Sequence, residues 1–119
     1  MDEDLAAWGK VVVIETVGRR SGQRRRAPVG FVTDGDGSLL IAASGPETQW
    51  ARNLLVEPRC HVQRDGARLA CRAHPLSEPE RQATVAALIL KYGTPAERLG
   101  MGPAFRLVPT GPAAPDGAT

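Results

Sequence analysis

The chain has 119 residues, of which 42% are apolar and 24% are charged, and these proportions predict one globular domain. A formal net charge of only +2 argues against a dedicated nucleic-acid binder. No run approaches the roughly 18 apolar residues of a transmembrane helix, and the acidic start at 1–4 is unlike a basic secretory signal. We therefore expect a soluble, cytoplasmic protein.

The first half of the chain predicts three strands and a helix. The β-branched run at 10–17 reads as a strand buried on both faces. Two further strands are expected at 28–33 and 38–44, joined by the Asp-Gly-Asp-Gly turn at 34–37. Thr48 can cap a helix that ends at Glu57, before a proline. Trp50 and Leu54 would share one face of that helix.

A hairpin is predicted next, around Asp65-Gly66, a pair typical of two-residue turns. This turn places Cys60 opposite Cys71 and Val62 opposite Leu69, all on one apolar face. In a cytosolic compartment we expect the two cysteines to be free, packed thiols.

The last part of the chain predicts a helix and a short strand. Ser77 and Glu80 form a capping box for a helix that ends near Tyr92. Its core stripe is expected to consist of Val85, Leu88, Ile89 and Tyr92. A final strand is predicted at 105–108.

These elements predict one folded domain at 11–109, between an N-terminal segment at 1–10 and a disordered Gly/Pro/Ala tail at 110–119. The fold class is α+β: an antiparallel, barrel-like sheet with two packed helices.

The segment at 16–28 is the one that indicates chemistry. It follows a strand, contains two glycines, and holds five arginines within eight residues, at 19, 20, 24, 25 and 26. Guanidinium groups and accessible backbone N–H groups suit a phosphate-bearing ligand, although a solvated basic turn is the alternative. We find no nucleophile with its base and no metal-ligand spacing, so we expect no catalytic side chain and no metal.

Four motifs in order carry a resemblance to a known family. They are Thr16-Val17-Gly18-Arg19-Arg20-Ser21-Gly22, Arg25-Arg26-Ala27-Pro28, Ala42-Ala43-Ser44 and Trp50-Ala51-Arg52-Asn53-Leu54. Together they resemble the deazaflavin-dependent nitroreductase family, within the FMN-binding split-barrel superfamily. The resemblance spans about residues 11 to 109.

The resemblance implies a split β-barrel that binds coenzyme F420, with FMN as the alternative cofactor. It implies hydride transfer to a small organic acceptor: a quinone, an enone or a nitro compound. A cofactor carrier with little turnover is the other alternative, and a homodimer is one oligomeric state that the sequence allows. The implied contacts to the anionic arm are Arg19, Arg20, Ser21, Arg25, Arg26, Ala27, Pro28, Val29 and Gly30. Those to the deazaflavin or its linker are Ala42, Ala43, Ser44, Gly45, Gln49, Trp50 and Asn53.

The chain also departs from that family's usual pattern. The connection at 45–49 is short, Ala51 stands where an aromatic residue is common, and Tyr92 is the only tyrosine. These departures predict a thinner acceptor site, so cofactor binding should be better preserved than turnover of bulky acceptors.

Overall fold

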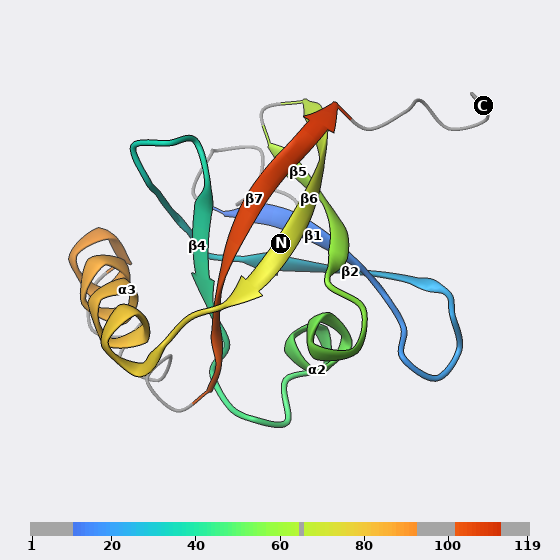
Figure 1. The fold of residues 1–119 in the computed structure, drawn as a ribbon, viewed down its shortest axis with the longest axis horizontal. Helices are drawn as coiled ribbons and strands as arrows, with labels where there is room; N and C mark the ends of the chain where they lie inside the picture. Colours follow the sequence, from blue (N-terminus) through green and yellow to red (C-terminus); the bar gives the residue numbers. More distant parts are fainter. Residues whose placement is uncertain (1–10, 65, 93–101, 113–119) are drawn as a thin grey trace.

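Seven antiparallel strands form one curled sheet in the computed structural model, which describes residues 11–64, 66–92 and 102–112 (Figure 1). Helix α2 (Gln49–Val56) packs on β1 and β2, and helix α3 (Glu78–Tyr92) packs on β3, β4 and β7. The predicted α+β split barrel with two packed helices is therefore confirmed. In sheet order the strands are β2 (Arg24–Val29), β1 (Val12–Val17), β5 (Arg59–Arg64), β6 (Ala67–Pro75), β7 (Ala104–Pro112), β4 (Leu39–Ala42) and β3 (Val32–Thr33).

The turn predicted at 34–37 forms, and the strands on either side of the second predicted turn pair in the expected register. The Asp34 N–H donates to the Ser38 carbonyl oxygen over 2.9 Å, and Gly37 has φ +88°, which closes the turn between β3 and β4. The β5–β6 register pairs Cys60 with Cys71 and Val62 with Leu69, as predicted. Turn chemistry and apolar pattern thus specify the same register.

Three strand predictions need correction. Strand β1 buries only alternate residues, because its other face, which includes Glu15, forms the outer surface of the sheet. The expected strand at 28–33 is instead two strands: β2 begins inside the arginine window and ends at Val29, and β3 starts at Val32. A stretch of arginines therefore forms an edge strand, although its residues are mostly exposed.

The last strand is longer than predicted. Strand β7 continues to Pro112, three residues into the predicted tail, and Gly111 pairs with Ala70 of β6. A register irregularity at Ala70/Cys71 accommodates this pairing, as β-bulges do. The remaining tail residues, 113–119, and the N-terminal segment at 1–10 lie outside the described residues.

Both helices begin where the sequence predicts. Thr48 is the N-cap residue of α2, but its hydroxyl accepts from the Gly45 N–H over 3.3 Å and makes no capping bond. At α3, the Glu80 carboxylate accepts from the backbone N–H and the hydroxyl of Ser77, over 3.2 and 2.8 Å. Leu88 of α3 is fully buried, and the partly buried side chains of Val85, Ile89 and Tyr92 pack against the same cluster.

The main core lies between α2 and the curled sheet. Phe105 and Ile14 are among its fully buried side chains, and Trp50 and Leu54 of α2 pack into the same cluster. Both cysteines are buried there as free thiols, as expected.

Candidate functional site

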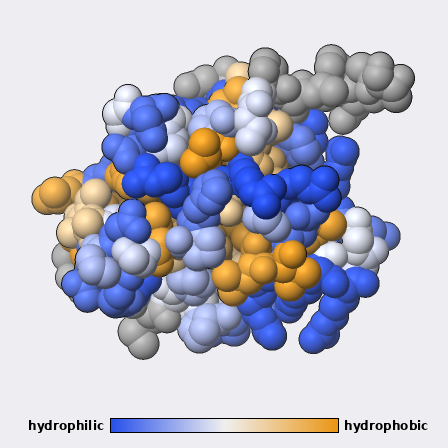
Figure 2. Space-filling view, in the orientation of Figure 1, coloured by the Kyte–Doolittle hydropathy of each residue, from blue (hydrophilic) through white to orange (hydrophobic). Residues whose placement is uncertain are grey.

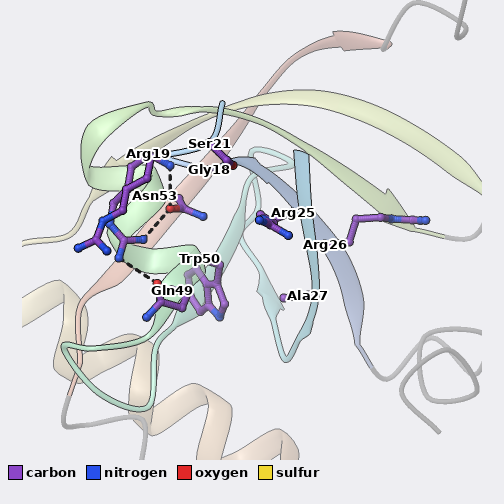
Figure 3. A pocket seen from close by; sticks show the side chains of 10 residues that line it. Gly18, Arg19, Ser21, Arg25, Arg26, Ala27, Gln49, Trp50 and Asn53 are labelled. Atoms are coloured by element: carbon purple, nitrogen blue, oxygen red, sulfur yellow. Dashed lines mark hydrogen bonds between the residues drawn. The ribbon is translucent and has the colours of Figure 1, made fainter. Parts of the chain in front are cut away.

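A cavity of about 420 Å³ opens between the β1–β2 hairpin and the first turns of α2 (Figure 3). Its size falls in the range of small-molecule sites, about 300–1,000 Å³. The arginine window supplies one wall and the helix supplies the other, so the cavity joins three of the four sequence motifs. Its lining consists of Gly18, Arg19, Arg20, Ser21, Arg25, Arg26, Ala27, Gln49, Trp50 and Asn53.

The loop between β1 and β2 is tightly closed on itself. The Gly18 N–H donates to the Gln23 carbonyl oxygen, and the Gly22 N–H donates to the Gly18 carbonyl oxygen, each over 2.8 Å. A Cβ atom at Gly18 would lie 2.7 Å from the Ser21 hydroxyl oxygen and 3.1 Å from the Gln23 carbonyl oxygen, so a larger residue would require the loop to shift. Gly22 adopts φ +70°, a conformation that favours glycine. Both glycines therefore favour the loop that presents Arg19 and Arg20.

Asn53 fastens this loop to the helix. Its amide oxygen accepts from the backbone N–H of Arg19 over 3.2 Å and from Nη1 of Arg19 over 2.8 Å. Its amide nitrogen donates to the hydroxyl of Thr16 over 3.1 Å. Asn53 is 3% exposed and Thr16 is 1% exposed, so a buried amide connects α2, the end of β1 and the loop.

The arginines of the window differ in how their guanidinium groups are used. Arg19 donates to Asn53 and, through Nη2, to Gln49 Oε1 over 2.9 Å (Figure 3). Arg26 points away from these side chains and donates to Gln63 on the outer face of the sheet. Within the described part of the chain, the guanidinium groups of Arg20 and Arg25 form no hydrogen bond or ion pair.

The electrostatics of the loop are those of an anion site. Desolvation, and then the positive charges of Arg52 and Arg20, lower the pKa of Arg19 from its ordinary value. Guanidinium groups this close repel one another, and a bound anion would relieve that repulsion.

Trp50 forms the apolar part of the cavity wall. Its ring lies 6.1 Å from that of Phe105 in a tilted arrangement, so one part belongs to the core while another lines the cavity. Ala27 contributes a small side chain to the same cavity. An aromatic wall beside guanidinium groups suits a ligand with a flat ring and an anionic arm.

Seven of the residues implied by the resemblance do not line this cavity. Val29 is in the core, Gly30 lies beneath the ring of Tyr92, and Pro28 is exposed. Ala42 and Ala43 are buried; Ser44 and Gly45 follow them in the connection to α2. Their contact with a cofactor stays a prediction.

Two residues matter here that we had not singled out as binding residues. Thr16 and Gly18 belong to the first motif. The Thr16 hydroxyl accepts a hydrogen bond from Asn53, and Gly18 allows the loop to pass close to Ser21 and Gln23. A signal for Thr16 exists in the sequence: it is a polar residue at a core-facing position of an alternating strand. Among the described residues, no group of His, Cys, Asp and Glu could hold a metal ion. In the same ranges, no helix is long and apolar enough to cross a membrane.

Solved structures share this fold. An F420-H2 dependent reductase, FDR-A, superposes with a TM-score of 0.68 at 24% identity, over 82% of this chain and 93% of that one. A protein of unknown function from Agrobacterium tumefaciens str. C58 gives 0.73 at 21% identity, over 87% of this chain and 49% of that one. A conserved hypothetical protein from Mycobacterium tuberculosis gives 0.71 at 18% identity, over 90% and 77%. No curated protein matches significantly.

The curled sheet thus defines a split-barrel protein, and the basic cavity between the β1–β2 hairpin and α2 is its candidate site. The model of the F420H(2)-dependent quinone reductase family matches residues 4–98, most of the chain. The chain therefore belongs to this family; it is an F420-dependent oxidoreductase, and its cofactor is coenzyme F420.

Proposed function

We propose that the cavity between the β1–β2 hairpin and α2 is the F420 site, and that Arg20 and Arg25 bind the anionic arm of the cofactor. The observation that carries this proposal is that both residues line the cavity, while their guanidinium groups form no hydrogen bond or ion pair within the described residues. The F420 arm carries a phosphodiester and carboxylates, which are the groups that arginine binds best.

Arg19 has a different role in this proposal. Its guanidinium donates to Asn53 and Gln49, and its backbone N–H donates to Asn53. It therefore positions the loop, and through the loop it positions Arg20. Trp50 would border the ring of the cofactor, since it is the aromatic residue of the cavity lining.

The acceptor we propose is a small quinone, enone or nitro compound. When bound, reduced F420 supplies a hydride, so the chain itself has to bind and orient rather than provide a nucleophile. Its only tyrosine, Tyr92, is bonded to the backbone of Phe31 instead of lining the cavity. Ala51 is fully buried in the core, so it contributes no side chain to an acceptor site.

A titration of the purified protein with F420 and with FMN, followed by fluorescence quenching, tests the cofactor site. We expect tighter binding of F420 at moderate salt, because several anionic groups can meet Arg20 and Arg25. Equal or tighter binding of FMN would contradict the proposal.

Stopped-flow oxidation of the reduced cofactor tests the acceptor. We expect faster reduction of small quinones and enones than of bulky nitroimidazoles, because few side chains are available to hold a bulky acceptor in place. Turnover of a bulky nitroimidazole at a rate equal to that of the small quinones would contradict this expectation.

A further inference from the structure

Helix α2 exposes two neighbouring apolar side chains that the cofactor site does not use. Within the described residues, the exposed large hydrophobic side chains are Leu55, Val56 and Leu90, with exposed fractions of 58%, 66% and 89%. Leu55 and Val56 are consecutive in the last turn of α2, whereas Leu90 stands by itself on α3. Neither Leu55 nor Val56 lines the cavity. A pair of exposed apolar side chains on one helix end indicates a contact surface more than a single one does.

Arginines lie on both sides of this apolar pair. Arg52 precedes Leu55 and Val56 by three and four residues, so it lies next to them along the helix. Arg59 follows at the start of β5. Figure 2 shows an apolar patch where Figure 1 places α2, with strongly hydrophilic residues above and below it.

The positive charge of this surface is only partly compensated. Glu57 forms an ion pair with Arg59. The hydrogen bond from Arg59 lowers the pKa of Glu57 most, and the positive charge of Arg72 lowers it further. The side chains of Arg52 and Arg72 form no ion pair or hydrogen bond with any residue in the described ranges. We refer to Arg52, Leu55, Val56, Arg59 and Arg72 as the α2 patch.

We propose that the α2 patch docks on the surface of an anionic lipid bilayer. Leu55 and Val56 would enter the headgroup boundary, and the flanking arginines would meet lipid phosphates. A second protein is a poorer fit, because two apolar side chains expose far less than the roughly 800 Å² per partner that a stable protein interface buries. Arginine favours this arrangement since its stem packs on apolar groups while its head pairs with phosphate.

The cofactor proposal and this one are independent. Gln49, Trp50 and Asn53 of α2 line the cavity, whereas Leu55 and Val56 do not. The Leu55→Ser/Val56→Ser variant should therefore bind F420 like the parent chain, and that measurement also shows that this variant is folded. A loss of vesicle binding with intact F420 affinity is specific to the patch.

Co-sedimentation with vesicles tests the proposal. The parent chain should bind vesicles of phosphatidylglycerol and phosphatidylcholine, bind pure phosphatidylcholine much less, and lose binding at high salt. The double variant Leu55→Ser/Val56→Ser should lower the partition coefficient at least tenfold. Arg52→Gln should lower it about fivefold. The matched control Leu90→Ser removes an even more exposed leucine from α3 and should change nothing.

Three results would overturn the proposal. The parent chain could fail to sediment with anionic vesicles at low salt, or Leu90→Ser could weaken binding as much as the double variant. The double variant could also leave vesicle binding unchanged while shifting the chain's own association state in analytical ultracentrifugation, which would assign the patch to contact with a second copy.

Discussion

The two helices are fastened to the same sheet in different ways. Helix α3 is held by side chains that bond to backbone: the Tyr92 hydroxyl accepts from the Phe31 N–H over 3.1 Å, and Lys91 Nζ donates to the Phe31 carbonyl oxygen over 2.7 Å. Helix α2 is held through Asn53, whose side chain bonds to the side chains of Thr16 and Arg19 and to the backbone N–H of Arg19. The first arrangement fixes a strand junction, whereas the second fixes a loop that carries charge.

This difference separates stability from binding. Around α3, the polar groups of Tyr92 and Lys91 are bonded to Phe31, which lies between β2 and β3. Around α2, bonding Arg19 to the helix leaves Arg20 and Arg25 facing the cavity. Substitutions at α3 should therefore change the free energy of unfolding with little effect on cofactor affinity, and substitutions at Asn53 should change both.

The largest expected effect is at Tyr92. Tyr92→Ala removes the ring packed over Gly30 and both hydrogen bonds to Phe31, and should lower the free energy of unfolding by about 3 kcal/mol. Tyr92→Phe removes only the hydroxyl and should cost about 1 kcal/mol. Urea denaturation measures both values. F420 affinity should stay at the parent value in Tyr92→Phe, and a parallel loss of affinity would show that α3 is part of the site.

A smaller loss of stability is expected at Asn53, together with weaker binding. Asn53→Leu leaves the Arg19 N–H without its acceptor, and should lower the free energy of unfolding by about 2 kcal/mol. F420 affinity should fall as well, because the loop that presents Arg20 is no longer held. Denaturation and cofactor titration check the two effects.

Asn53→Asp is the matched control for that experiment. It keeps an acceptor for Arg19, and the Thr16 hydroxyl can donate to it, so it should retain more affinity than Asn53→Leu. If both variants bind F420 like the parent chain, Asn53 contributes to the stability of the fold and not to cofactor binding.

The smallest effect concerns the cysteines, which lie on β5 and β6. Burial raises the pKa of Cys60 from 9.0 to about 12 and that of Cys71 to about 11. The unfolded chain ionises its thiols first, so this stabilisation is complete below the ordinary pKa and is lost as pH rises toward the folded values. By pH 10 each thiol should account for about 1.4 kcal/mol of lost stability. The difference between parent and Cys60→Ala in urea denaturation from pH 8 to 10 measures it; a constant difference would contradict the burial.

The sequence predicts best where two independent signals agree. The Asp65-Gly66 turn and the alternation from Cys60 to Cys71 specify one register, and the structure has it. The arginine strand was missed because strands are inferred from apolar alternation, and β2 has exposed arginines on an edge. The end of β7 was missed because Pro109, Gly111 and Pro112 are typical of a tail until the partner strand is known.

Within the candidate site, the sequence predicts which residues lie close together, but it does not predict which arginine is hydrogen-bonded to the protein and which is left for a ligand. Arg19 and Arg20 are neighbours of the same type, and nothing local distinguishes them. They differ because Asn53, 34 positions from Arg19, lies within reach of one guanidinium and not the other. Such a long-range choice depends on how α2 packs against β1, which only the folded chain determines.

The central claim, that Arg20 and Arg25 bind the cofactor's anionic arm, is tested most directly by F420 titration of three single variants. Arg20→Ala and Arg25→Ala should each weaken binding by about 1.5–3 kcal/mol, the range for hydrogen bonds to charged groups. Arg72→Ala removes an equally unbonded arginine of β6 that is outside the cavity lining, and its affinity should equal that of the parent. Equal affinities in all three variants, or an equal loss in all three, would contradict the assignment of the cavity.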